Sequence, residues 1–311
     1  SGPVLLALEM MAKRPAAEAI VVQHLQRPQA DSALRLAYAR TLMGAQRLLE
    51  SSAQIERVTK ERPEFAPPFL TLGALHLELR HPQEAEAALK RYLELVQGAP
   101  TAAAAGDDDD DDAERSAEGI AQATLMLAQA AEQRGDYAAA EAWLMRVEDP
   151  KRALDVQTRR ATLMARQGRL AEAREVLRRA PGREAGDARA KLVAEASLLR
   201  DVKRWGEAYD VLGRAAQAFP DDADLLYEQA MVAEKMSRID DMERLLRRVI
   251  ELKPDSAHAH NALGYSLADR GQRLAEARDL VRRALELSPG DPFITDSLGW
   301  VEFRLGNADE A

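Results

Sequence analysis

The chain has 311 residues, of which 46% are hydrophobic and 31% charged, and its formal net charge is −9. It contains no cysteine, which excludes disulfides, thiolate metal sites and cysteine nucleophiles. No apolar stretch approaches the roughly 20 residues of a membrane-spanning helix, and no concentrated basic face is present to bind nucleic acid.

Small residues return along the chain at a nearly constant interval, which indicates internal repeats. The spacings between successive copies are 34, 55, 33, 35, 34, 34 and 35 residues. The residues at this position are Ala39, Gly73, Ala128, Ala161, Ala196, Ala230, Gly264 and Gly299. Because Ala, Leu, Glu, Arg and Gln dominate the sequence, the copies are predicted to be helical.

Nine copies are predicted in chain order, each a first helix (helix A), a turn and a second helix (helix B). They begin near residues 1, 32, 66, 121, 154, 189, 223, 257 and 292. Glycines such as Gly135, Gly168 and Gly271 end helix A and permit the turn, and Pro289 fixes the exit after a helix B. The first copy lacks the start of helix A, and the last lacks helix B. One hairpin cannot bury its apolar faces alone, so the copies are expected to stack as a solenoid.

The long spacing of 55 residues indicates one insertion, predicted at residues 98–115, with six consecutive aspartates from Asp107 to Asp112. Blocks of like charge repel one another, so a flexible acidic loop is predicted. A divalent-cation site is the alternative, although consecutive aspartates lack the alternating ligands of a calcium loop. The last aspartates are expected near the N-terminus of the next helix, where they favour its dipole. The chain thus divides into N-terminal repeats at 1–97, the insertion, and C-terminal repeats at 116–311 with a truncated last copy.

Catalytic motifs are absent from the sequence. It has no HExxH, no G-x-S-x-G, no Walker-type phosphate loop and no G-x-G-x-x-G. His258 and His260 are two residues apart and so leave a helix on different faces, whereas paired zinc ligands on a helix are three or four apart. No catalytic residue, metal site or cofactor is therefore predicted, and the chain is not expected to be an enzyme.

The best-formed copy reads His260-x2-Leu263-Gly264-x2-Leu267, then Ala277-x3-Val281-x2-Ala284, and closes at Pro289. This pattern resembles the tetratricopeptide repeat (TPR), a helix–turn–helix of 34 residues with small residues where its two helices touch. The resemblance covers nearly the whole chain outside the predicted insertion. It implies an all-α fold, a right-handed superhelical solenoid of antiparallel helix pairs, which works by holding other proteins.

In the TPR family the inner surface is lined by helix A, chiefly at repeat positions 2, 5, 9, 12 and 13. In the last three copies these positions hold a concentration of aromatic and Met side chains. An exposed aromatic cluster with polar neighbours is the usual makeup of a peptide-binding hot spot. The alternative is that these side chains pack against a further helix or the next repeat. The predicted partner-binding residues are Tyr227, Met231, His258, Asn261, Tyr265, Asp296, Trp300, Phe303 and Arg304.

Several segments resemble a narrower group, the lipid-anchored periplasmic TPR proteins of Gram-negative bacteria. These segments are residues 6–26, 62–68, 262–265, 271–274 and 296–301. Members of that group are adaptors that bring cell-wall hydrolases to a carboxyl-terminal processing protease. The resemblance implies a protein of the periplasm, or one anchored to the outer membrane, with a periplasmic protease and its substrates as partners. A cytoplasmic location is the alternative.

Two further functions stay open. The chain could be the TPR portion of a larger enzyme, such as a glycosyltransferase with an N-terminal superhelix. It could also be a module that forms homo-oligomers, because an uncapped last copy can stack on another molecule.

Overall fold

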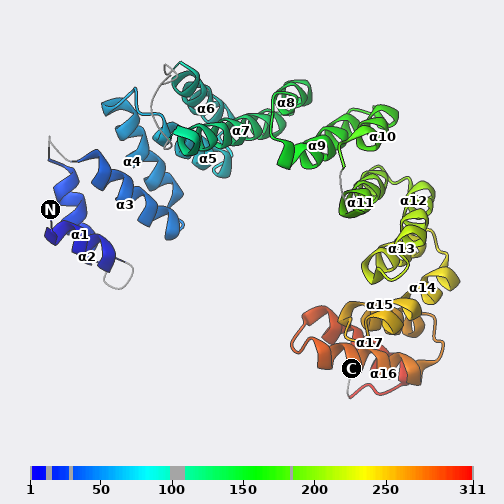
Figure 1. Ribbon diagram of the computed structural model, residues 1–311. Helices are drawn as coiled ribbons and strands as arrows, with labels where there is room; N and C mark the ends of the chain where they lie inside the picture. Colours follow the sequence, from blue (N-terminus) through cyan, green and yellow to red (C-terminus); the bar gives the residue numbers. More distant parts are fainter. Residues whose placement is uncertain (1, 12–15, 28–30, 99–108, 183–184, 310–311) are drawn as a thin grey trace. The chain divides into compact units, whose positions relative to one another are not determined.

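The computed structural model describes residues 2–11, 16–27, 31–98, 109–182 and 185–309 (Figure 1). Within these ranges every regular element is a helix, with seventeen α-helices and one short 3-10 helix, η1 (Pro150–Arg152). The chain forms two compact units, Ser1–Val156 and Gln157–Ala311. The predicted all-α solenoid of antiparallel helix pairs is confirmed within each unit.

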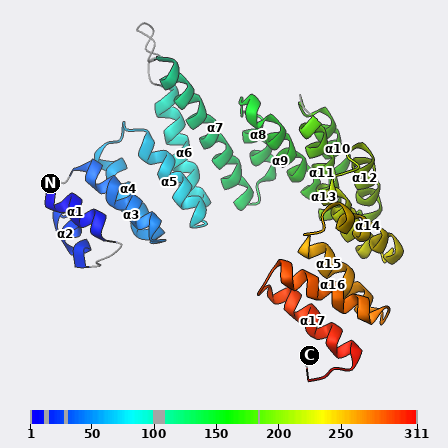
Figure 2. The ribbon, with the colours of Figure 1, turned by 60° about the horizontal axis from the view of Figure 1, so that its bottom comes forward.

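Unit 1 contains four helix pairs. In chain order these are α1 (Gly2–Met10) with α2 (Ala16–Leu25), α3 (Ser32–Gly44) with α4 (Leu48–Glu61), α5 (Pro67–Glu78) with α6 (Pro82–Gln97), and α7 (Asp109–Gln133) with α8 (Tyr137–Leu144). The two helices of each pair are in contact, and successive pairs meet through α4 with α5 and α6 with α7 (Figure 2). Each copy therefore buries its apolar faces against the next one along the chain.

Unit 2 begins within α9 and continues the same alternation of A and B helices. Its elements are α9 (Ala153–Arg166), α10 (Leu170–Arg179), α11 (Ala185–Asp201), α12 (Trp205–Ala218), α13 (Ala223–Lys235), α14 (Ile239–Leu252), α15 (Ala257–Asp269), α16 (Leu274–Leu287) and α17 (Pro292–Leu305). One continuous apolar core runs from Ala196 in α11 to Val301 in α17. The A helices α15 and α17 also touch each other directly.

The fourth copy begins earlier than the sequence predicts. Its helix A, α7, starts at Asp109 rather than near residue 121 and runs for 25 residues. The predicted loop is therefore wrong for residues 109–115, which are helical, and residues 99–108 lie outside the described residues. Acidic residues at a helix N-terminus interact favourably with the helix dipole, which explains how an aspartate run can begin a helix.

The turn between helices A and B contains a left-handed residue in each copy whose turn is described, and the turn of the eighth copy contains a second one at Arg273. Glycine fills this position in three copies, as predicted, at Gly135, Gly168 and Gly271. Four other copies place a residue with a Cβ there, at Gln46, Arg80, Lys203 and Ser237. A side chain in this conformation costs roughly 1–2 kcal/mol, so these four turns are strained positions that the surrounding helix packing maintains.

Small residues lie where the two helices of a copy touch, as predicted. A Cβ at Gly264 would lie 2.6 Å from Cγ2 of Val281 and 2.9 Å from the carbonyl oxygen of Ala277. In the third copy, a Cβ at Gly73 would lie 2.5 Å from Cγ of Leu89. Both distances are shorter than van der Waals contact, so only glycine lets these helices approach as closely as they do.

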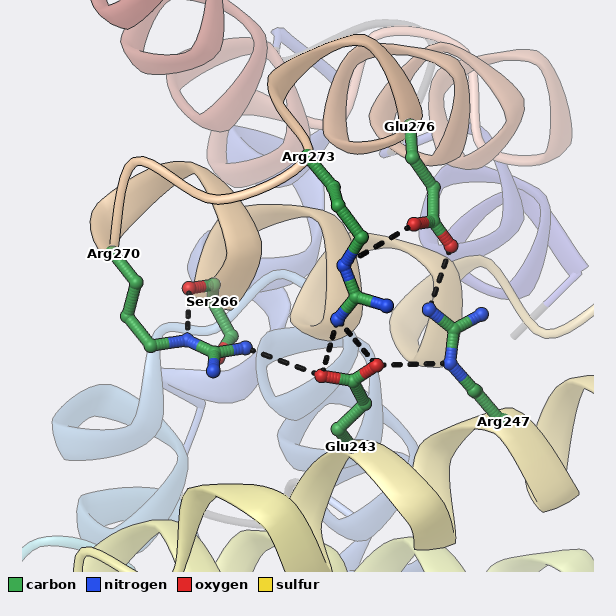
Figure 3. Close-up of polar contacts among 6 residues, drawn as sticks. All are labelled: Glu243, Arg247, Ser266, Arg270, Arg273 and Glu276. Carbon is green, nitrogen blue, oxygen red and sulfur yellow. Dashed lines mark hydrogen bonds and ion pairs between the residues drawn. The ribbon is translucent and has the colours of Figure 1, made fainter.

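Arginine recurs at the N-cap of helix B, and the sequence prediction missed this feature. The five arginines are Arg47, Arg169, Arg204, Arg238 and Arg273. Each pairs with the acidic residue three positions later. Two of them also reach a carboxylate in the preceding copy: Arg47 bonds Glu18 at 2.8 Å, and Arg273 bonds Glu243 at 2.6 Å (Figure 3). These arginines therefore join neighbouring copies by charge as well as by apolar packing.

Candidate functional site

The predicted partner-binding residues lie on three successive A helices of unit 2: α13, α15 and α17. On α15, Leu263 and Leu267 face the core and are fully buried, whereas Tyr265 is 42% exposed. His258, Asn261 and Tyr265 are separated by three and four positions, so they form one stripe along the helix. The same spacing relates Tyr227 to Met231 on α13, and it relates Asp296, Trp300 and Phe303 on α17. Each A helix therefore presents the predicted positions as a single line of side chains, which we call the A-helix stripe.

The stripe is only partly open to solvent. Tyr265 and Phe303 are exposed, at 42% and 58%. Tyr227, Met231 and Trp300 are half-buried and pack against the core of unit 2. The expectation that the aromatics at these positions lie outside the core is thus wrong for Tyr227 and Trp300, because their large rings reach the apolar surface between helices. Burial also raises the pKa of the Tyr227 hydroxyl, and the nearby Glu234 carboxylate adds to this effect.

Three residues on α17 form an aromatic platform. The rings of Trp300 and Phe303 are stacked, with centroids 5.6 Å apart and planes 21° apart. The guanidinium of Arg304 lies 5.5 Å from the centre of the Trp300 ring, within the range of a cation–π contact. Arg304 also donates a hydrogen bond of 2.6 Å to the carbonyl oxygen of Asp269 at the end of α15. Arg304 therefore connects α17 to α15 and holds one side of the platform in place.

The polar members of the stripe have different surroundings. His258 and Asp296 are exposed. The side-chain oxygen of Asn261 and the indole nitrogen of Trp300 are buried without a hydrogen-bond partner among the described residues. An unpaired buried polar group costs roughly 1–3 kcal/mol. A ligand that supplied a donor to Asn261 or an acceptor to Trp300 would recover part of that cost.

One residue of this surface was missed by the sequence prediction. Phe293, near the start of α17, is 79% exposed and is among the large apolar side chains most open to solvent in the described chain. It occupies repeat position 2, as His258 does in the preceding copy. The repeat register alone could have identified it.

The described residues contain no group of three or more His, Asp or Glu side chains placed to hold a metal ion. No described helix is long and apolar enough to cross a membrane. The chemistry available at the stripe is therefore apolar contact, stacking on aromatic rings and hydrogen bonding.

Comparisons with known proteins agree with this geometry. The sequence model of the tetratricopeptide repeat family matches residues 227–292, which contain the α13 and α15 parts of the stripe. A crystal structure of the C-terminal part of a TPR repeat-containing protein from Cytophaga hutchinsonii superposes with a TM-score of 0.52 at 12% sequence identity, covering 85% of this chain and 99% of that one. At this identity the similarity shows the TPR fold alone.

Two curated proteins are related in sequence. A TPR repeat-containing protein of Pseudomonas aeruginosa is 34% identical over 158 residues, which make up 51% of this chain and 27% of that protein. The cellulose synthase 2 operon protein C of Komagataeibacter xylinus is 32% identical over 207 residues, which make up 64% of this chain and 15% of that protein. The chain therefore spans only a small part of the length of either relative.

Proposed function

We propose that this chain is a non-enzymatic docking scaffold that binds a protein or an extended peptide along the A-helix stripe. Two exposed aromatic side chains carry the proposal. They are Tyr265 on α15 and Phe303 on α17, and Phe303 stacks on Trp300 in the aromatic platform. Exposed aromatics that gather on one face mark interaction surfaces, and only 5% of this chain is aromatic. The TPR fold itself is consistent with a protein-interaction role.

Binding at the stripe requires no bond to be made or broken. An apolar side chain of the partner packs on the Trp300–Phe303 platform, and Tyr265 extends the contact onto α15. Asn261 and Asp296 face the backbone or polar side chains of the same segment and set its position by hydrogen bonds. Because consecutive A helices repeat these positions, an extended segment makes several weak contacts at once, and together they give usable affinity.

The proposed biological role is that of an adaptor in the envelope of a Gram-negative bacterium. The segments that resemble periplasmic TPR lipoproteins support this role, as does the similarity to a TPR protein of Pseudomonas aeruginosa. The partners are a carboxyl-terminal processing protease and the proteins it degrades, and the adaptor raises the concentration of substrate near the protease. Fractionation of the source organism with an antibody to this chain tests the location. Recovery with cytoplasmic proteins alone would contradict it.

A second candidate is that the chain is the TPR portion of a larger polypeptide that serves polysaccharide synthesis. The similarity to the cellulose synthase 2 operon protein C favours it. Purifying the native protein from the source organism and measuring its mass and its co-purifying enzymes separates the two candidates. Association with a glycosyltransferase would favour the second, and association with a protease the first.

The stripe itself is tested with peptides selected on the wild-type chain. Short random peptides displayed on phage are selected on immobilised protein, and the dissociation constants of the selected peptides are measured by fluorescence anisotropy. Tyr265→Ala and Phe303→Ala should each weaken binding about tenfold, which corresponds to about 1.4 kcal/mol. The matched control is Leu49→Ala on α4, whose side chain is 64% exposed far from the stripe in sequence. Unchanged binding by both stripe variants, with helicity intact, would show that the partner binds elsewhere.

A further inference from the structure

Helix α8 is shorter than most other B helices, and the residues that follow it do not resume an α-helical path before α9. It ends at Leu144 after 8 residues, whereas α4, α12, α14 and α16 each have 14. Pro150 holds the preceding residue, Asp149, in an extended conformation with φ −111° and ψ 108°. The Asp149 side chain then caps η1 by accepting a hydrogen bond of 2.9 Å from the backbone N–H of Lys151. The chain therefore leaves the helical path about two turns before a full B helix would end.

The missing turns of α8 leave a groove above the N-terminal half of α7. Its volume is about 1180 Å³, and it is bounded by α6, α7 and residues 143–152. The floor is apolar, because Leu93 belongs to the core of this part of unit 1 and Ile120 and Trp143 pack against that core. The guanidinium of Arg146 lies 4.7 Å from the centre of the Trp143 ring. Met145 lies at the edge of the groove with 65% of its surface exposed. This volume exceeds that of a typical small-molecule pocket and suits a segment of polypeptide.

The floor of the groove is held firmly by the packing of α6 against α7. Gly119 of α7 lies directly under the ring of Tyr92 on α6, so that a Cβ at this position would overlap the Tyr92 hydroxyl. Tyr92 is 6% exposed. The two helices therefore cannot move apart or slide without exposing this ring.

One wall of the groove carries three exposed glutamates together with Lys90 of α6. Glu114 and Glu118 project from α7 with 77% and 69% of their side-chain surface exposed, and Glu94 on α6 is 65% exposed. A cationic ligand at this wall would meet the carboxylates of Glu114 and Glu118.

The chain's own cations show that positive groups fit opposite this wall. The ammonium of Lys151 lies 3.8 Å from Glu114, and the guanidinium of Arg152 lies 3.9 Å from Glu118. Both distances are too long for direct hydrogen bonds, and ion pairs between exposed side chains contribute little to stability. An incoming Lys or Arg can therefore replace these contacts at small cost.

We infer that this groove docks a basic segment of a partner protein, with a large apolar side chain over Trp143 and Met145 and lysines or arginines against Glu114 and Glu118. Methionine suits such a contact because its flexible, polarisable side chain adapts to different partners. This second site lies in unit 1 and shares no residue with the A-helix stripe, so either site can fail without the other.

Disulfide trapping tests the inference directly, because the chain has no cysteine of its own. Met145→Cys places one thiol at the groove, and Leu49→Cys gives a control of matched exposure, at 65% and 64% for the natural residues. Each variant of the full chain is equilibrated with two synthetic peptides that carry one cysteine among leucines and either lysines or glutamates. The trapped fraction is measured by mass spectrometry under mild reducing conditions.

The Met145→Cys variant should trap the lysine peptide in preference to the glutamate peptide about tenfold, and the preference should fall towards that of the control in high salt. The Leu49→Cys control should show only the weak preference for the lysine peptide that follows from the chain's net charge of −9. Adding Glu114→Gln and Glu118→Gln to Met145→Cys should remove most of the preference, whereas Glu286→Gln should not change it. Equal preference at positions 145 and 49, or no effect of the two groove substitutions, would overturn the proposal. Tyr265→Ala should leave the trapping unchanged, which separates this site from the stripe.

Discussion

Replacing Glu243 with glutamine should destabilise unit 2 by about 2 kcal/mol at neutral pH. Glu243 lies on α14 and accepts hydrogen bonds from three arginines: Arg247 on its own helix at 3.0 Å, Arg270 at the end of α15 at 3.4 Å, and Arg273 at 2.5 and 2.6 Å (Figure 3). Arg247 and Arg273 also pair with Glu276 on α16. The carboxylate therefore connects two copies of the repeat through one network.

The magnitude follows from the electrostatics of this network. Hydrogen bonds from Arg273 first, then from Arg247, lower the pKa of Glu243 from 4.5 to about 2. Lowering a pKa by one is worth about 1.36 kcal/mol, so the change at Glu243 can stabilise the folded state by at most about 3.4 kcal/mol. Arg247 and Arg273 are 40% and 47% exposed, so water and salt screen the interaction, and we expect about 2 kcal/mol to be lost. Glutamine keeps the shape and one acceptor, so the loss reports mainly the charge.

The effect should depend on pH in a defined direction. Because the pKa of Glu243 is lower in the folded state, the stabilisation is fully present above the unfolded pKa of about 4.5 and is lost as the pH falls towards about 2. Glutamine does not titrate. The difference in unfolding free energy between the wild type and Glu243→Gln should therefore be constant above pH 5 and shrink to near zero by pH 2.

Urea unfolding followed by circular dichroism, on the full chain at several pH values, measures this difference. Repeat proteins can unfold in segments, so hydrogen exchange of α14, α15 and α16 amides should locate the loss. The control is Glu286→Gln on α16, whose side chain is 66% exposed and pairs with Arg283 at 2.9 Å; it should cost less than about 0.5 kcal/mol. If both variants lose the same stability, or if the difference persists unchanged at pH 2, the network does not act as described.

Two further substitutions test the packing and the turns of the repeat. Gly264→Ala should cost about 1–3 kcal/mol, because its Cβ would overlap the carbonyl oxygen of Ala277, which cannot rotate away. Gly206→Ala is the control, because the atom nearest to its Cβ would be Cε of Met236 at 3.9 Å. It should leave stability unchanged or raise it by up to about 1 kcal/mol. Equal thermal midpoints for the two variants would contradict the close-packing argument. Ser237→Gly should raise stability by about 0.5–1 kcal/mol because Ser237 has φ +57°, and Gly135→Ala should lower it; a fall in the midpoint for Ser237→Gly would show that the turn is not strained.

Most of the fold could be predicted from the sequence because its causes recur at a fixed interval. Gly264 is required by contact with α16, and glycine at 135, 168 and 271 is favoured by a left-handed turn. Each cause acts within one copy, so the spacing of small residues is sufficient to place the helices. The N-cap arginines recur at the same interval, each with an acid three residues later, and could have been found in the same way.

The start of α7 and the burial of the stripe could not be predicted in that way. Six aspartates are equally compatible with a solvated loop and with the favourable N-terminus of a helix, and composition does not decide between them. The half-burial of Trp300 and Tyr227 depends on where large rings lie between helices, which a one-dimensional pattern does not record. The groove beside α8 depends on the early end of α8 at Leu144 and on its packing against the long α7 (Figure 2), and the repeat pattern records neither.

A comparison of the copies with one another bears on the proposal that the stripe binds a partner. The residue after the recurring small position varies in type between copies, and at Met231 and Trp300 it packs against the core of unit 2. In chain order this residue is Arg40, Ala74, Gln129, Thr162, Ser197, Met231, Tyr265 and Trp300. The small position before it stays Ala or Gly in all eight copies, which shows how strongly packing constrains a contact residue. Large apolar side chains occur at the position after it only in the last three copies, where Met231 and Trp300 pack against the core of unit 2 and Tyr265 is 42% exposed. The exposure of Tyr265 is the part of this pattern that the proposed partner accounts for.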